Sequence, residues 1–113
     1  MNRYIVLYKA PLSVATRFAQ ATPEEAQQGL KLWVQWAQRL GPALLDPGRP
    51  LGNAVRVTRA SAVKTDSRVI GMSLVQAVSM EGALDLVRDH HHLHWAEDCE
   101  IEVLEEMPIP ELA

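Results

Sequence analysis

Residues 22–41, TPEEAQQGLKLWVQWAQRLG, contain the strongest local folding signal in the chain. Thr22 precedes Pro23, a residue favoured at the first helical position, and Glu25 completes a capping box with Thr22. Gly41 supplies a residue that adopts the left-handed conformation after a last helical turn. The segment therefore predicts a helix that begins at Pro23 and ends before Gly41.

The apolar side chains of this helix exceed what one buried stripe needs. Trp36 lies beside the main stripe, whereas Leu32 and Val34 point away from it. A sizeable exposed apolar surface usually marks an interface, so we expect loops or a second copy of the chain to cover it. The residues expected in the main stripe are Ala26, Leu30, Trp33, Ala37 and Leu40.

The other segments alternate between strand and helix patterns. Residues 12–21 form a polar connection, and Ser79 is the N-cap of a second helix within residues 79–90. The order βα, β-meander, αβ predicts an α+β, ferredoxin-like sandwich: an antiparallel sheet with two helices on one face. We expect one domain over residues 1–113, with a proline-broken tail at 107–113. Strand patterns occur at residues 3–9, 43–45, 53–59, 61–65, 68–78 and 99–107.

The strand at residues 68–78 has two different faces. Ile70, Met72 and Leu74 make one apolar face. The opposite face carries small residues, among them Gly71, Ser73 and Ala77, between valines. Small side chains admit a closely packed helix or leave room for a ligand, so Ser73 is a candidate ligand-binding residue.

Composition excludes several classes of function. The 113 residues carry 11 basic and 14 acidic side chains spread along the chain, so we expect no nucleic-acid partner. Cys99 has no internal disulfide partner, and the apolar run at residues 4–8 is too short for a signal peptide or a membrane span. We therefore expect a cytoplasmic protein with no membrane partner. No cofactor fingerprint occurs, so no cofactor is expected.

All four histidines lie in the segment DHHHLHW, residues 89–95, and three interpretations are open. His90 and His94 have the spacing of two metal ligands on one helical face. An imidazole paired with Asp46 or Asp89 fits acid–base chemistry near neutral pH. Alternatively, the histidines are solvated residues at the end of the second helix, where the helix dipole favours them.

Several motifs together resemble the YCII-related domain family, in its branch of small stand-alone proteins. They are RYIVLYKAP, LWVQWAQRLG, LLDPGRPLG, GMSLVQAVSMEGALDLV and IEVLEEMPIP. The branch's D-x-G-x-P-L turn matches at Asp46, Gly48 and Pro50-Leu51, and its paired helix tryptophans match Trp33 and Trp36. Its His-Pro-His-Leu motif matches at His90, His92 and Leu93, and His91 departs from it. The founding branch has a histidine in the first helix, where this chain reads EEAQQG.

The resemblance implies a homodimer that forms a dimeric α+β barrel. One related member is a chlorinated-hydroquinone dehydrochlorinase, and a histidine–aspartate pair has been suggested as catalytic in the founding branch. We therefore expect His92 or His90 to act as a base, oriented by Asp46, in a proton transfer or elimination on a small organic molecule. Trp33, Trp36 and Ser73 are expected to contact that ligand.

The alternative is a non-catalytic module that binds a small ligand or a protein. In that case Trp33 and Trp36 are core or interface residues at helical spacing. Asp46, which precedes Pro-Gly, then forms a turn. Cys99 is expected to be a small buried hydrophobe rather than a nucleophile.

Overall fold

Four strands form an antiparallel sheet in the computed structural model, which describes residues 1–110. The order across the sheet is β2-β5-β1-β6, and each neighbouring pair is antiparallel. The last part of the predicted tail, residues 111–113, lies outside the described residues. The bounds of the four strands are β1 Asn2–Lys9, β2 Leu44–Pro50, β5 Val69–Ala77 and β6 Glu100–Glu105.

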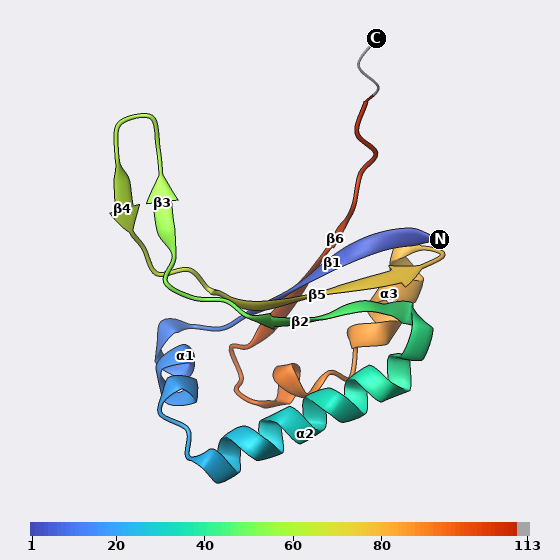
Figure 1. The fold of residues 1–113 in the computed structure, drawn as a ribbon, viewed down its shortest axis with the longest axis horizontal. Coiled ribbons are helices and arrows are strands. Elements are labelled where there is room, and N and C mark those ends of the chain that lie inside the picture. The colour runs from blue at the N-terminus through green and yellow to red at the C-terminus, as the bar shows by residue number, and fades with distance from the viewer. Residues whose placement is uncertain (111–113) are drawn as a thin grey trace.

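The helices lie on one side of this sheet (Figure 1). They are α1 Leu12–Ala19, α2 Pro23–Leu40 and α3 Met80–Val87, with short 3₁₀ turns η1 at Gly41–Ala43 and η2 at His91–His94. The predicted α+β architecture is confirmed, and the connectivity is compatible with a ferredoxin-like fold. A separate two-stranded sheet, β3 Val55–Val57 and β4 Ala62–Lys64, projects on the side away from the helices.

The predicted ends of α2 are confirmed. The Thr22 hydroxyl accepts from the Glu25 amide at 3.2 Å, and the Glu25 carboxylate accepts from the Thr22 amide at 3.3 Å. Gly41 follows the helix with φ 55° and ψ −128°, so its φ is positive as predicted, but it does not adopt the left-handed helical conformation.

The predicted buried stripe of α2 is wrong at two positions. Ala26 is exposed and Leu30 is 62% exposed, because the N-terminal half of α2 does not reach the core. Trp36, which was assigned beside the stripe, is 2% exposed and belongs to the core. Its indole Nε1 donates to the Leu86 carbonyl at 2.9 Å, which ties α2 to α3. Leu32 and Val34 are exposed, as expected.

The core lies between the helices and one face of the sheet. Tyr4, Val6 and Tyr8 alternate along β1 toward the helices, opposite the small residues of β5. Ser73 and Val75 are fully buried on that face, so the small side chains of β5 admit closely packed helices. The opposite face remains uncovered among the described residues and carries Ile5, Leu7, Met72, Leu74 and Leu104.

Three further sequence predictions need correction. Residues 12–19 form α1 rather than a polar connection, and Val14 of this helix packs against Ala10 and Cys99. β2 continues to Pro50, beyond the predicted end at residue 45, because it stays paired with β5 up to Pro50 across two register shifts. The second helix ends at Val87, before the histidines. None of the helices among residues 1–110 combines the length and apolarity needed to cross a membrane.

Candidate functional site

The histidine segment forms a separate 3₁₀ turn after α3. His90 has extended backbone angles, φ −61° and ψ 136°, and its ring Nδ1 accepts from the His92 amide at 3.1 Å. This side-chain cap starts η2, so the histidines do not continue the second helix. His90 is fully buried and His92 is 7% exposed, which contradicts the solvated interpretation for both. His94 is exposed and fits that interpretation.

Tyr8 of β1 is the centre of the cluster. Its ring centroid lies 4.9 Å from that of His90 and 5.5 Å from that of His92. The Trp33 ring meets Tyr8 edge-on at 5.0 Å, and the Trp36 ring meets His90 at 4.6 Å. Such edge-to-face contacts stabilise aromatic clusters beyond simple area burial. Five of the six predicted site residues, His90, His92, Trp33, Trp36 and Ser73, therefore gather around a tyrosine that was not predicted.

A buried hydrogen-bond chain runs from Tyr8 to β2. The Tyr8 hydroxyl lies 2.9 Å from Ser73 Oγ, and Ser73 Oγ lies 2.7 Å from the Pro47 carbonyl oxygen. A carbonyl only accepts, so Ser73 donates to Pro47 and Tyr8 donates to Ser73. Burial raises the pKa of Tyr8, and the bond to Ser73 opposes that rise. The phenol therefore stays protonated and acts as a fixed donor.

The geometry assigns the protonation state of His90. Its Nδ1 accepts a backbone N–H, so a neutral ring carries its proton on Nε2. Burial, followed by the nearby His91 and His92, lowers the pKa of His90 to about 3. His90 is therefore neutral at physiological pH. Its Nε2 is buried with no hydrogen-bond partner among the described residues.

His92 is held differently. Its Nε2 lies 2.9 Å from the Lys9 carbonyl oxygen, which fixes the proton on Nε2 in the neutral ring. The lone pair is then on Nδ1. This atom accepts no hydrogen bond from the described residues, and it is not completely buried. A neutral imidazole oriented through one nitrogen and free at the other has the arrangement of a general base.

Asp46 lies outside the aromatic cluster. One carboxylate oxygen accepts from the Gly48 amide at 2.8 Å, and the other accepts from Arg49 at 2.8 Å. The Gly48 amide, then Arg49, lowers the pKa of Asp46. Gly48 has φ 89°, and a Cβ there would overlap the Met72 carbonyl oxygen. These contacts fit the turn-forming alternative for Asp46, and its orienting role stays a prediction.

Other candidate residues do not join the site. Cys99 is buried beside Ala10 and Val14, and burial raises the pKa of its thiol, so it resembles a small hydrophobe. His90 is buried while His94 is exposed, so the two do not share one face as predicted for metal ligands. Over residues 1–110, no group of three or more histidine, cysteine, aspartate or glutamate side chains is arranged to hold a metal.

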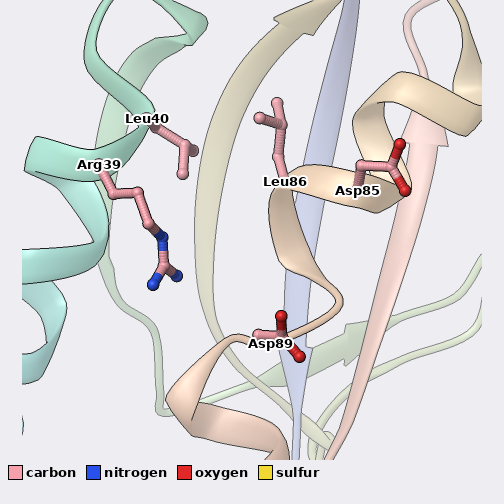
Figure 2. Close-up of a pocket in the computed structure, with 5 residues that line it drawn as sticks. All are labelled: Arg39, Leu40, Asp85, Leu86 and Asp89. Atoms are coloured by element: carbon pink, nitrogen blue, oxygen red, sulfur yellow. The ribbon is translucent and has the colours of Figure 1, made fainter.

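Two surface hollows occur outside this cluster. One, of about 270 Å³, lies between α2 and α3. Figure 2 shows Leu40 of α2 and Leu86 of α3 on opposite sides of this hollow, while the carboxylates of Asp85 and Asp89 point away from Arg39. The other, of about 320 Å³, is lined by α1 and the segments that flank the β3–β4 hairpin. Neither hollow is lined by a histidine.

Sequence reasoning missed Tyr8, Lys9 and Pro47. Tyr8 could have been identified as a core residue from the sequence, because it alternates with Tyr4 and Val6 on a central strand. Lys9 and Pro47 contribute backbone carbonyls, which carry no signal in residue identity.

The chain matches no known family model, and no curated protein matches it. The resemblance to the YCII-related family therefore depends on the quoted motifs alone.

Proposed function

We propose that this protein is a small YCII-like enzyme that transfers a proton during an elimination or isomerisation of a small organic molecule. His92 is the acid–base residue. The observation that carries the proposal is the hydrogen bond from His92 Nε2 to the Lys9 carbonyl, because it leaves the Nδ1 lone pair available. On a chlorinated hydroquinone, the ring carbon that bears chlorine first gains the proton of the hydroxyl beside it, which becomes a carbonyl. Nδ1 then takes the proton of the other hydroxyl, its O–H electron pair forms the second carbonyl as the ring double bond shifts, and chloride leaves with its bonding pair to give the quinone.

His90 has a supporting role in this proposal. Its low pKa of about 3 makes it a weak base at neutral pH. Its Nδ1 instead holds the His92 amide and so sets the position of the His92 backbone. Trp33 and His91 are half-buried and lie edge-on to each other at 5.6 Å, on the outer side of this cluster. These two rings are the proposed contact surface for a planar substrate.

The second candidate is a ligand-binding module without chemistry. It is favoured by one observation: within residues 1–110, no histidine forms a hydrogen bond or ion pair with a carboxylate. Acid–base histidines are commonly oriented by such a carboxylate, whereas here a backbone carbonyl has that position.

A binding and turnover experiment separates the two candidates. The probes are chlorohydroquinone, catechol, 4-hydroxybenzoate and lactate, with thermal stability reporting binding and chloride release reporting turnover of chlorohydroquinone. We expect His92→Gln to lower turnover by about 10²–10⁴-fold, whereas the exposed control His94→Gln leaves it unchanged. Stabilisation by a probe without turnover would favour the binding module. Wild-type turnover in His92→Gln would overturn the role of His92, and no response to any probe would overturn both candidates.

The proposal includes a homodimer in a reducing compartment, the cytoplasm. The uncovered face of the sheet, with Ile5, Leu7, Met72 and Leu74, is the proposed contact. Four strands of this length cover roughly 500 Å², so two stacked faces bury about 1,000 Å² before side chains and loops are added. That buried area reaches the lower limit for a stable dimer, so a second copy of the chain can cover the exposed face of the sheet.

Paired variants test which surface forms the dimer. Leu74→Glu places a charge in the sheet face, whereas Leu32→Glu places one on the exposed side of α2. We expect Leu74→Glu to give a monomer by sedimentation at micromolar concentration, and Leu32→Glu to remain a dimer. The reverse result would move the interface to α2, and a monomeric wild type would remove the dimer.

A further inference from the structure

The β3–β4 hairpin is an exposed arm with a strong charge bias. Residues 55–64 contain Arg56, Arg59 and Lys64 and no acidic side chain. None of these three cations forms an ion pair within the described chain. Val57 is 76% exposed, and no other strand of the described residues pairs with either edge of the hairpin. This apolar, basic arm therefore has no ion-pair partner and no neighbouring strand among residues 1–110.

The first half of β6 and the residues before it have the opposite bias. This edge, residues 97–102, contains Glu97, Asp98, Glu100 and Glu102 and no basic side chain. Arg68 pairs with Glu100 and Lys9 lies 3.8 Å from Glu102, which leaves a net charge of −2 at this edge. All four carboxylates are on exposed residues, so they remain open to further cations.

The arm and the acidic edge lie at the same end of the sheet but at opposite edges. Val69, which follows the hairpin, pairs with Lys9, and Lys9 pairs with Glu100, so these residues form one row across the strands. Three strand spacings, about 14 Å, separate the two edges within one chain. The arm therefore does not meet the acidic edge of its own chain.

The arm is long enough to reach a second sheet. It projects on the uncovered side, opposite the helices (Figure 1). From Val55 to the turn at Arg59 the extended chain covers about 13 Å, whereas two sheets stacked face to face are about 10 Å apart. A two-fold axis parallel to the strands places the arm of one copy beside residues 97–102 of the other.

We infer that the β3–β4 hairpin is a dimerisation arm that binds the acidic β6 edge of a second copy through its three cations. This inference rests on the proposed contact between the uncovered sheet faces. It adds a recognition element to that contact, because complementary charge selects one two-fold axis among those that stack the two faces. The exposed valines of the arm become covered in the same contact.

Charge reversal tests the energetic part of the inference. We expect Arg59→Glu with Lys64→Glu to raise the dimer dissociation constant by at least about tenfold at low ionic strength, with the difference shrinking as salt screens the charges. Adding Glu97→Lys and Asp98→Lys to this variant should bring the dimer dissociation constant back to within about threefold of the wild-type value. Lys31→Glu, an exposed reversal on α2, is the control and should have no effect.

Disulfide trapping tests the geometry. Ala60→Cys and Glu97→Cys are made in separate Cys99→Ala chains, oxidised alone or after mixing, and run on a non-reducing gel. The mixture should give a covalent dimer and each chain alone should not, because a disulfide requires Cα atoms within about 7 Å.

Three outcomes have distinct meanings. If charge reversal in the arm leaves the dimer dissociation constant unchanged and the mixture gives no covalent dimer, the role of the arm in dimerisation is overturned. The proposed sheet-face dimer would then remain. A monomeric wild type overturns both. Trapping together with charge rescue supports both.

Discussion

Ser73→Ala is expected to destabilise this protein more than Tyr8→Phe, although it is the smaller change. The two hydroxyls form a one-way chain in which Tyr8 donates to Ser73 and Ser73 donates to the Pro47 carbonyl. Tyr8→Phe removes the first donor and leaves the second bond intact. One net hydrogen bond is lost, which costs about 1 kcal/mol of unfolding free energy.

Removing Ser73 has a larger consequence. It breaks both bonds and leaves the Tyr8 hydroxyl, on a side chain only 2% exposed, as a buried donor without an acceptor. The desolvation penalty of such a group is about 1–3 kcal/mol, so the total cost is about 2–4 kcal/mol. In the double variant no hydroxyl is left unpaired, and the cost falls to about 1–2 kcal/mol. The two single costs add to about 3–5 kcal/mol, so the coupling between the two sites is about 2–3 kcal/mol.

Urea unfolding followed by circular dichroism at fixed protein concentration measures this cycle. Tyr4→Phe combined with Ser73→Ala is the control, because Tyr4 is equally buried on the same face of β1 and its hydroxyl contacts Asn2. That pair should be additive within about 0.5 kcal/mol. A coupling near zero for Tyr8 and Ser73, or a larger cost for Tyr8→Phe than for Ser73→Ala, would refute the assigned hydrogen-bond chain.

The remaining predictions concern pH, glycine and helix capping. In the unfolded chain His90 binds a proton as the pH falls below its ordinary pKa of 6.5, whereas in the folded protein the pKa is about 3. Between these two values protonation favours the unfolded chain, so the free energy of unfolding is highest above pH 6.5 and falls as the pH drops toward 3. Across this range the free energy of unfolding should change with pH more steeply in wild type than in His90→Asn, by up to about 1.4 kcal/mol per pH unit. Equal slopes in the two proteins would contradict the buried neutral ring. Gly48→Ala should destabilise by more than about 2 kcal/mol because its Cβ meets the Met72 carbonyl, whereas Gly29→Ala, with open space around it, should stabilise by about 0.5–1 kcal/mol; thermal unfolding of both variants tests the contrast. Thr22→Ala should cost about 1 kcal/mol by the same assay, and an unchanged transition would mean that the capping box does not stabilise α2.

The sequence predicts those parts of the fold that depend on neighbours along the chain. The capping box at Thr22 and the alternation in β1, β5 and β6 are local patterns, and each element forms where expected. The prediction of the buried stripe on α2 was wrong at its N-terminal end, because helical spacing identifies which face is buried but not how far along the helix the core extends. Leu30 has the correct spacing and is 62% exposed, because the buried core of the described chain reaches only the C-terminal half of α2.

The candidate site was predicted in its residues but not in its organisation. His90, His92, Trp33, Trp36 and Ser73 converge as residue types. Tyr8, which contacts four of these five residues, becomes central through strand register, which sequence spacing does not determine. Asp46 was chosen for its carboxylate, and local bonds to Gly48 and Arg49 occupy both of its oxygens.

The pairing of β1 with β6 has a consequence for how the protein folds during synthesis. Residues 2–9 need residues 100–105 as a neighbour, so the first strand waits for nearly the whole chain before its edge is covered. The α2 helix, which has its own capping box, can form from local contacts before β6 is available, because loop closure over long sequence separations is slow. Until β6 arrives, the free edge of β1 is open to pairing with strands of other chains, which makes the last strand a protection against misassembly on the ribosome.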